Sequence, residues 1–124
     1  MRWIVDAMNV IGTKPDGWWK DRHAAMVRLV ESLERWAAST GNDVLVVFER
    51  PPSPPIESAA IEIASAPRPG PNSADCEIVR LLRDEADPEE IRVVTSDHAL
   101  ADQVRAKGAT VEPAEPFRRR INQA

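Results

Sequence analysis

The chain has 124 residues, of which 43% are hydrophobic and 29% are charged, with a formal net charge of −4. This composition is typical of a globular protein and excludes the disordered and fibrous classes, while the length corresponds to a single domain over residues 1 to 124. The negative charge argues against indiscriminate nucleic-acid binding, which depends on Lys and Arg at the phosphates.

Two further features bear on where the protein is found. The single cysteine, Cys76, cannot form an internal disulfide, and its place in a helical pattern favours a core position over a nucleophile. No segment has the apolar length that a signal peptide or a membrane span requires. We therefore expect a cytoplasmic protein without a membrane partner, present as a monomer or a weak homo-oligomer.

The first half of the chain shows the pattern of a strand, a helix and a second strand. Residues 2 to 6 form a short apolar run that ends in an acid, typical of a buried strand. Glycines and prolines predict a loop over residues 9 to 19. Hydrophobic residues recur at helical spacing over residues 21 to 39, and Gly41 ends this helix. The β-branched run over residues 44 to 48 is typical of a strand covered on both faces, so the three elements indicate a right-handed βαβ unit.

The second half continues the alternation with less regular connections. Prolines over residues 51 to 55 exclude a helix there, and residues 60 to 65 predict a weaker strand, although residues 57 to 63 are also compatible with a helix. The remaining elements are a helix from residue 72 or 73, a strand over 91 to 95, a helix over 98 to 106, a strand over 109 to 111 and a terminal helical turn over 117 to 121. We therefore predict an α/β fold with three layers, α/β/α, around a mostly parallel sheet.

Acidic residues stand where the predicted strands end. Asp6 follows the first strand, Glu49 the second and Asp97 the strand over residues 91 to 95, while Asp75 lies in the first turn of an apolar helix. Because the carboxyl ends of parallel strands form one rim of a sheet, these acids can converge. Clustered carboxylates repel one another unless a cation neutralises them. Oxygen ligands suit Mg²⁺ and Mn²⁺, so the pattern predicts a magnesium or manganese site.

Each of these acids also has a structural explanation. Asp6 could form an Asx turn, Asp97 could cap the helix over residues 98 to 106, and Glu49 could pair with its neighbouring arginine at the surface. Asp75 lies three residues after Asn72, where a capping-box acid belongs. Capping alone does not require several acids on one rim, because Ser, Thr or Asn would cap without repulsion. The joint pattern therefore favours the metal site.

Neutral polar residues accompany the acids. Asn9 can orient a carboxylate, a water or a phosphate, with a turn-forming asparagine as the alternative. Hydroxyls and backbone N–H groups at a helix start can bind phosphate, although simple capping by Ser96 is the plainer interpretation. The candidate substrate-binding residues at the two helix starts are Asn72, Ser73, Thr95 and Ser96.

Aromatic and basic residues are grouped after Asn9. The group comprises Trp18, Trp19, Lys14, Lys20 and Arg22. Rings that stack on bases and cations that bind phosphates are the means by which single-stranded RNA is held, so these residues are candidates for RNA binding. At least one tryptophan is expected to pack beneath the first helix instead. The basic residues 118 to 120 could extend a phosphate track or belong to a solvated terminal helix.

Four segments, taken in chain order, resemble the NYN domain family and, within it, the YacP-like ribonuclease branch. They are residues 4 to 11, Ile-Val-Asp-Ala-Met-Asn-Val-Ile; 46 to 49, Val-Val-Phe-Glu; 70 to 75, Gly-Pro-Asn-Ser-Ala-Asp; and 93 to 97, Val-Val-Thr-Ser-Asp. The similarity extends to Gly108, Ala109 and Phe117, and so covers nearly the whole chain. It implies a PIN-like fold and a Mg²⁺- or Mn²⁺-dependent endoribonuclease that hydrolyses RNA phosphodiester bonds.

The resemblance also implies residue roles. By position, Asp6, Asp75 and Asp97 would be the metal-binding, catalytic acids, with Asn9 in support. The position after the second strand is commonly Asp in this branch and here is Glu49, which is longer by one methylene and is a candidate fourth metal ligand.

Two other functions are compatible with the pattern. One is an RNA-binding or ribosome-associated module of the same fold that cleaves nothing, for which the acidic net charge and Glu49 argue. The other is a phosphohydrolase or phospho-acceptor domain, because those α/β folds also place Asp at strand ends. The Asp-x-Asp pair of haloacid-dehalogenase-like phosphatases is absent, since Met8 occupies the second position.

Overall fold

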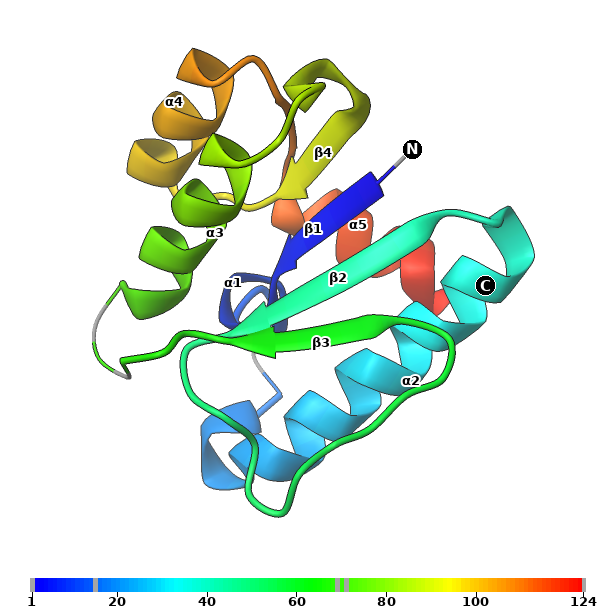
Figure 1. The fold of residues 1–124 in the computed structure, drawn as a ribbon. Coiled ribbons are helices and arrows are strands. Elements are labelled where there is room, and N and C mark those ends of the chain that lie inside the picture. The colour runs from blue at the N-terminus through cyan, green and yellow to red at the C-terminus, as the bar shows by residue number, and fades with distance from the viewer. Residues whose placement is uncertain (1, 15, 69, 71, 124) are drawn as a thin grey trace.

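The structure, a computed structural model, describes residues 2 to 14, 16 to 68, 70 and 72 to 123. Its centre is a sheet in which the strands pair in parallel in the order β3-β2-β1-β4-β5 (Figure 1). The strands are β1 (Arg2–Asp6), β2 (Asp43–Phe48), β3 (Glu62–Ser65), β4 (Ile91–Val94) and β5 (Thr110–Glu112). The predicted α/β class is confirmed, including the weaker strand β3.

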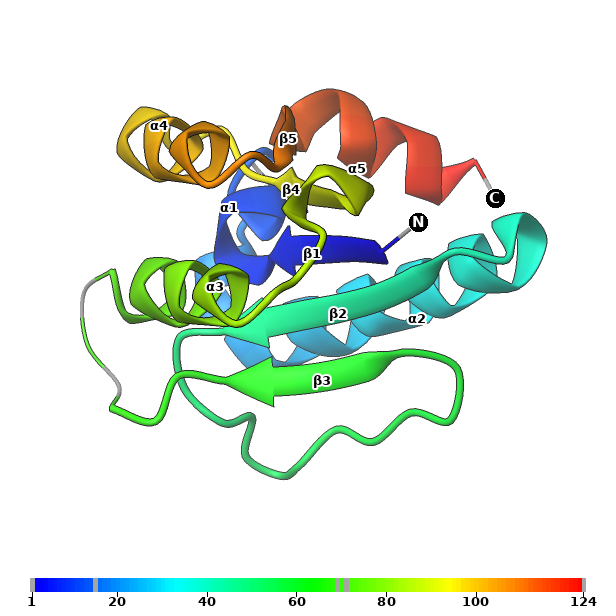
Figure 2. The same cartoon turned by 45° about the horizontal axis from the view of Figure 1, so that its top comes forward.

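Helices cover both faces of this sheet, as Figure 2 shows from the side. One layer contains α1 (Ala7–Ile11), α2 (Arg22–Thr40) and α5 (Ala114–Asn122), and the other contains α3 (Ser73–Arg83) and α4 (His98–Ala106). Short 3₁₀ helices, η1 (Trp18–Lys20) and η2 (Pro88–Glu90), precede α2 and β4. None of the helices in the described part of the chain has the length and apolarity to cross a membrane.

The strand sequences explain the two-sided core. Alternate residues of a strand point to opposite faces, so Val44, Val46 and Phe48 pack toward α2 while Leu45 and Val47 pack toward α3 and α4. A continuous apolar run is therefore what a parallel strand covered on both faces needs.

An aromatic cluster fills the core beneath α2 and α5. Trp3 lies 5.0 Å from Trp36 and 5.5 Å from Phe117, measured between ring centroids, and the Trp36 and Phe117 rings are 5.2 Å apart. Each such pair adds about 0.5–1.5 kcal/mol beyond the apolar area that it buries. This cluster joins the first strand to the last helix.

The structure differs from the sequence-based expectation in the segment after β1. A loop was predicted over residues 9 to 19, but α1 follows Asp6 directly and η1 lies further on. Ala7, Val10 and Ile11 are buried at the i, i+3, i+4 spacing of a helix. A helix of one turn is too short for this spacing to stand out in a sequence, and packing rather than propensity stabilises it.

Two smaller expectations were also corrected. Cys76 was expected in the core, but it is exposed, because the buried face of α3 is formed by its neighbours in the helix. The terminal helix is longer than the predicted turn and begins at Ala114, since Pro116 lies in its first turn, where proline is tolerated. By contrast, α4 has the predicted bounds, and α2 ends as expected at Gly41, whose φ of 74° is left-handed.

The strand order creates a switch point beside β1. From β1 the chain proceeds through β2 to β3 on one side, and later through β4 to β5 on the other side. The connections beyond β1 and β4 therefore diverge at the carboxyl ends of these strands. In open parallel sheets, ligands bind in the crevice that this divergence leaves.

We predict that Phe117→Ala lowers the free energy of unfolding by about 3–5 kcal/mol, because the fully buried ring leaves a cavity beside two tryptophans. Urea denaturation followed by circular dichroism measures the loss. The matched control is Trp19→Ala, whose residue is 54% exposed and whose ring contacts only the Trp18 ring among the aromatic pairs of the described residues, so its loss should cost about 1 kcal/mol or less. Equal effects of the two substitutions would contradict the assignment of the core.

Candidate active site at the carboxyl ends of β1 and β4

Asp6 lies at the switch point as the last residue of β1, and it is only 5% exposed. It occupies the N-cap position of α1, yet its carboxyl makes no capping hydrogen bond with the helix. Instead, the hydroxyl of Thr95, 1% exposed, donates a hydrogen bond of 3.0 Å to its Oδ2. The Asx-turn explanation of Asp6 therefore does not hold, and its burial calls for another reason.

The other three acids affect the ionisation of Asp6. Burial is the main cause that raises the pKa of Asp6 from its ordinary 3.8 to about 7, and the charge of Asp75 is the next. The Thr95 hydrogen bond opposes this rise, while Asp97 and Glu49 add to it. The pKa of Asp75 is itself raised by burial and by the charges of Asp97 and Glu49. The four acids, which come from different elements, are thus near enough to Asp6 or Asp75 to affect their ionisation, and a shared metal site stays a prediction.

Asp97 has a structural task as well as a place in this cluster. Its Oδ1 accepts a hydrogen bond of 2.9 Å from the backbone N–H of Leu100, so it caps α4 as one explanation foresaw. The backbone N–H of Asp97 donates to the Thr95 hydroxyl at 3.2 Å. The Thr95 side chain thereby links the turn that carries Asp97 to the carboxyl of Asp6.

Asn9 lies on α1 and fixes the same turn from the other side. Its Oδ1 accepts a hydrogen bond of 2.7 Å from the backbone N–H of Ser96. Ser96 does not cap α4, because its hydroxyl oxygen accepts the backbone N–H of Ala114 at 2.8 Å and so holds the start of α5. Both groups of Ser96 that were candidates for phosphate binding are engaged in this framework.

Glu49 and Asp75 are brought together by a contact between β2 and α3. The hydroxyl of Ser73 donates a hydrogen bond of 3.0 Å to the backbone carbonyl of Glu49. Asn72 has a left-handed φ of 60° and its side chain makes no capping hydrogen bond, so the capping-box explanation of Asp75 fails. Glu49 forms no ion pair with Arg50 among the ion pairs of the described residues.

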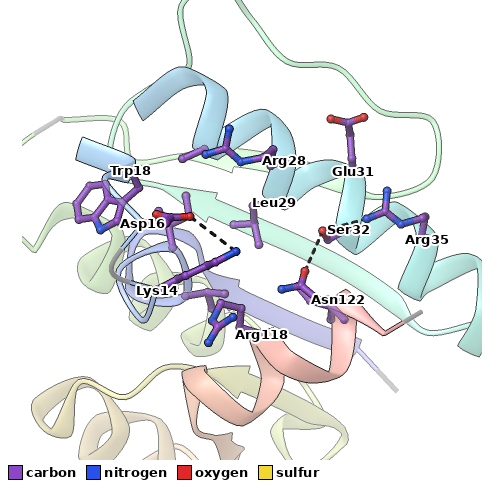
Figure 3. A pocket seen from close by; sticks show the side chains of 14 residues that line it. Lys14, Asp16, Trp18, Arg28, Leu29, Glu31, Ser32, Arg35, Arg118 and Asn122 are labelled. Carbon is purple, nitrogen blue, oxygen red and sulfur yellow. Dashed lines mark hydrogen bonds and ion pairs between the residues drawn. The ribbon is translucent and has the colours of Figure 1, made fainter. Parts of the chain in front are cut away.

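The three basic candidates lie in different places. Arg22, whose guanidinium lies 5.3 Å from the centroid of the Trp18 ring, lines a cavity of about 250 Å³ together with Glu49. Lys14 faces a separate cleft between α1, α2 and α5 (Figure 3). Lys20 is exposed on η1 and lines neither cavity. Of these three residues, Arg22 is the one that shares a cavity with an acid of the cluster.

The structure also places several residues where the sequence did not predict them. His23 and Arg50 line the cavity beside Glu49. Thr95 was a candidate for substrate binding, but in the structure it donates a hydrogen bond to Asp6. The two residues are 89 positions apart, and no spacing rule detects a contact of that kind. Glu77 is buried without joining the cluster, because Arg80 binds its carboxylate through two hydrogen bonds of 2.7 and 2.9 Å.

The donor set can be compared with what Mg²⁺ and Mn²⁺ require. Within the described ranges, no three Asp, Glu, His or Cys side chains are close enough together to hold one ion between them. Mg²⁺ usually keeps several waters and is bound through one or two carboxylates rather than by a complete protein cage. A buried Asp6 with Asp75 beside it meets that requirement, and a cation would offset the repulsion that raises both pKa values. The residues therefore fit a hydrated divalent ion.

Residues 3–124 match the family model of the YacP-like NYN domain. The chain belongs to the YacP-like NYN domain family. This family is nuclease-like. No curated protein matches the chain.

Solved structures support the same assignment of fold for this NYN domain. The crystal structure of Rae1 (YacP) from Bacillus subtilis is similar with a TM-score of 0.80 and 22% identity, over 99% of this chain and 74% of Rae1. Its W164L mutant gives a TM-score of 0.79 and 23% identity, over 98% and 75% of the two chains. The predicted resemblance is therefore confirmed.

We predict that the stability gained by Asp6→Asn depends on pH. In the folded wild type the Asp6 carboxyl keeps its proton up to about pH 7, whereas the unfolded chain releases it near pH 3.8, so wild-type stability falls as the pH rises through this window. The loss is complete above pH 7 and is on the order of 4 kcal/mol at most. Asparagine does not ionise, so the variant does not lose this stability. Its stability advantage over the wild type therefore grows between pH 4 and 7 and is constant above pH 7.

Urea denaturation at pH 4.5, 6 and 8 with a chelator present measures this advantage. Asp102→Asn, which alters an exposed acid on α4, is the control and should show no comparable trend. An advantage of Asp6→Asn that is the same at all three pH values would contradict the buried, proton-binding carboxyl.

We further predict that Thr95→Val raises the pKa of Asp6 above that of the wild type, because the hydrogen bond that favours the ionised form is lost. Valine keeps the shape of threonine, so the packing is retained. A ¹³C NMR titration of the Asp6 carboxyl carbon measures the shift. A titration midpoint that does not move would show that the hydrogen bond has no influence on ionisation.

Proposed function

We propose that this chain is a metal-dependent endoribonuclease that hydrolyses RNA phosphodiester bonds at the acidic cluster. The observation that carries the proposal is that the charges of Asp75, Asp97 and Glu49 all act on the buried carboxyl of Asp6. Such an arrangement lowers stability unless a cation is bound, and neither Asp6 nor Asp75 has a capping role that would explain it. The nuclease-like character of the family supports the same proposal.

Asp6 and Asp75 would hold Mg²⁺ or Mn²⁺, with Asp97 and Glu49 at the edge of the site. When bound, such an ion lowers the pKa of water and neutralises negative charge on a phosphodiester. Thr95 keeps the Asp6 carboxyl in one orientation through its hydrogen bond. Asn9 holds the turn before α4 and so fixes the position of Asp97. Asn9 and Thr95 are therefore positioning residues in this proposal.

The substrate would be single-stranded RNA. Trp19 is exposed and able to stack on a base, and Lys20 and Arg22 are exposed cations on the same segment. Phosphodiesters carry one negative charge each, so they approach an acidic rim only when a metal has reversed its local charge. RNA binding and metal binding at the rim are thus coupled.

A second candidate is an RNA-binding or ribosome-associated module of the same fold that does not cleave. Two observations favour it: no three potential ligands in the described part of the chain lie within reach of one ion, and Glu49 follows β2 where the branch commonly has Asp. The two candidates differ in whether bound RNA is cut, which a single assay decides.

We predict that the purified protein cleaves mixed-sequence single-stranded RNA with Mn²⁺ or Mg²⁺ and not with chelator. Asp75→Asn and Asp97→Asn should each lower the rate roughly 100-fold or more, because the site loses a charge that binds or orients the metal. Asp102→Asn serves as the control and should retain the wild-type rate. Thermal melting of each variant establishes that it is folded.

Each possible result has a distinct meaning. Cleavage that persists in Asp75→Asn and Asp97→Asn at the wild-type rate would refute the assigned site. RNA retention without cleavage by the wild type under all metal conditions would support the binding module. Hydrolysis of para-nitrophenyl phosphate without RNA cleavage would indicate a phosphohydrolase.

We also predict that Mn²⁺ raises the melting temperature more at pH 8 than at pH 5. Protons compete with the metal for Asp6, whose pKa of about 7 leaves it largely protonated at the lower pH. Differential scanning fluorimetry across a Mn²⁺ series measures the effect, and Asp6→Asn should largely abolish it. A stabilisation of equal size at both pH values would place the metal elsewhere.

A further inference from the structure

A second cavity, larger than the one beside Glu49, lies between α1, α2 and α5. This cleft has a volume of about 490 Å³ (Figure 3). Apolar side chains form part of its lining, and they are Val10, Ile11, Ala25, Leu29 and Ile121. Its size and apolar floor fall within the range of sites that bind ligands.

Cations predominate among the charged residues of the cleft. Lys14, Arg28, Arg35 and Arg118 line it, against the two acids Asp16 and Glu31. The carboxylate of Glu31 points away from α5 in Figure 3, and it forms no ion pair with Arg28 or Arg35 among the ion pairs of the described residues. The whole chain carries a net charge of −4, so this local excess of positive charge runs against the overall balance. Such an excess attracts anions.

Hydrogen bonds within the protein fix part of this cationic lining. The Nε of Arg118 donates to the hydroxyl of Thr13 at 2.8 Å, and Nη2 of Arg35 donates to the hydroxyl of Ser32 at 3.3 Å. The Lys14 ammonium is 4.0 Å from Asp16, at the limit of an ion pair, and Arg28 is exposed on α2. Groups held in place before binding lose less conformational entropy when a ligand arrives.

The cleft and the acidic cluster are neighbours across α1. This helix begins after Asp6 and ends at Ile11 in the floor of the cleft, and five residues of helix are roughly 7–8 Å long. Asn9 faces the acidic side through its bond to Ser96, while Val10 and Ile11 face the cleft. A polymer bound at one site can therefore reach the other within a few monomer units.

We propose that this cleft is a second contact site for the RNA strand, in which Arg28 and Arg35 bind phosphates and the apolar floor receives a ribose or base. Trp18, which also lines the cleft, adds an aromatic surface. This inference rests on the proposed function, because it takes the strand at the acidic cluster to be RNA. It assigns to α2 and α5 an RNA-binding role that does not require the metal.

The test is RNA binding with chelator present, so that cleavage does not enter the readout. Fluorescence anisotropy of a labelled single-stranded RNA of about twelve nucleotides, a length within the usual range of such sites, gives Kd over a KCl series. The double variant Arg28→Gln/Arg35→Gln removes two charges while keeping helix propensity. Its matched control, Arg83→Gln/Arg105→Gln, removes two exposed charges from α3 and α4 in the opposite layer.

We expect the cleft variant to bind roughly tenfold more weakly at low salt and to show a slope of log K against log[KCl] shallower by roughly 1.4, about 0.7 for each lost phosphate contact. The control should match the wild type in slope. Equal slopes and affinities for wild type and cleft variant, or no RNA binding by the wild type, would overturn the proposal. If the protein binds RNA in this way but does not cleave it, the cleft proposal stands and the nuclease proposal fails. The two proposals can therefore fail separately.

Discussion

The buried carboxyl of Asp6 is the constraint on which the site depends. It lies at the end of the central strand, where burial and the charge of Asp75 oppose its ionisation and the Thr95 hydrogen bond favours it. An asparagine would fill the same space without this conflict. An acid in this place lowers the stability of the folded chain, and the proposed binding of a cation would account for its presence.

The fold brings the remaining groups to Asp6 by contacts between element ends. Asn9 joins α1 to the turn after β4, and Ser73 joins α3 to the end of β2. Each contact joins a side chain on a helix to a backbone group in the segment that follows a strand, so the segments that carry Asp97 and Glu49 are fastened to helices. Sites supported in this way hold their geometry more accurately than sites on loops alone.

The sequence predicted the parts of this arrangement that local patterns encode. The run from Val44 to Phe48 indicated a strand buried on both faces, and the acids after the strands could be placed at one rim because parallel strands share an edge. The bonds from Thr95 to Asp6 and from Ser96 to Asn9 span 89 and 87 positions, and no periodicity reports on them. The helix α1 was not predicted because a single turn is too short for its hydrophobic spacing to stand out. The identity of the metal stays a prediction because it depends on atoms outside the chain.

In the two proposals, the acidic cluster and the basic cleft act in different ways on the negative charge of an RNA strand. The cleft would attract a phosphodiester strand whether or not a metal is present, whereas the rim would repel the strand until a cation reverses the local charge. Retention of the strand would then respond mainly to salt, whereas its admission to the rim would respond to metal and to the protonation of Asp6. The two proposals therefore make binding and cleavage separable, because each is assigned to its own set of charged groups.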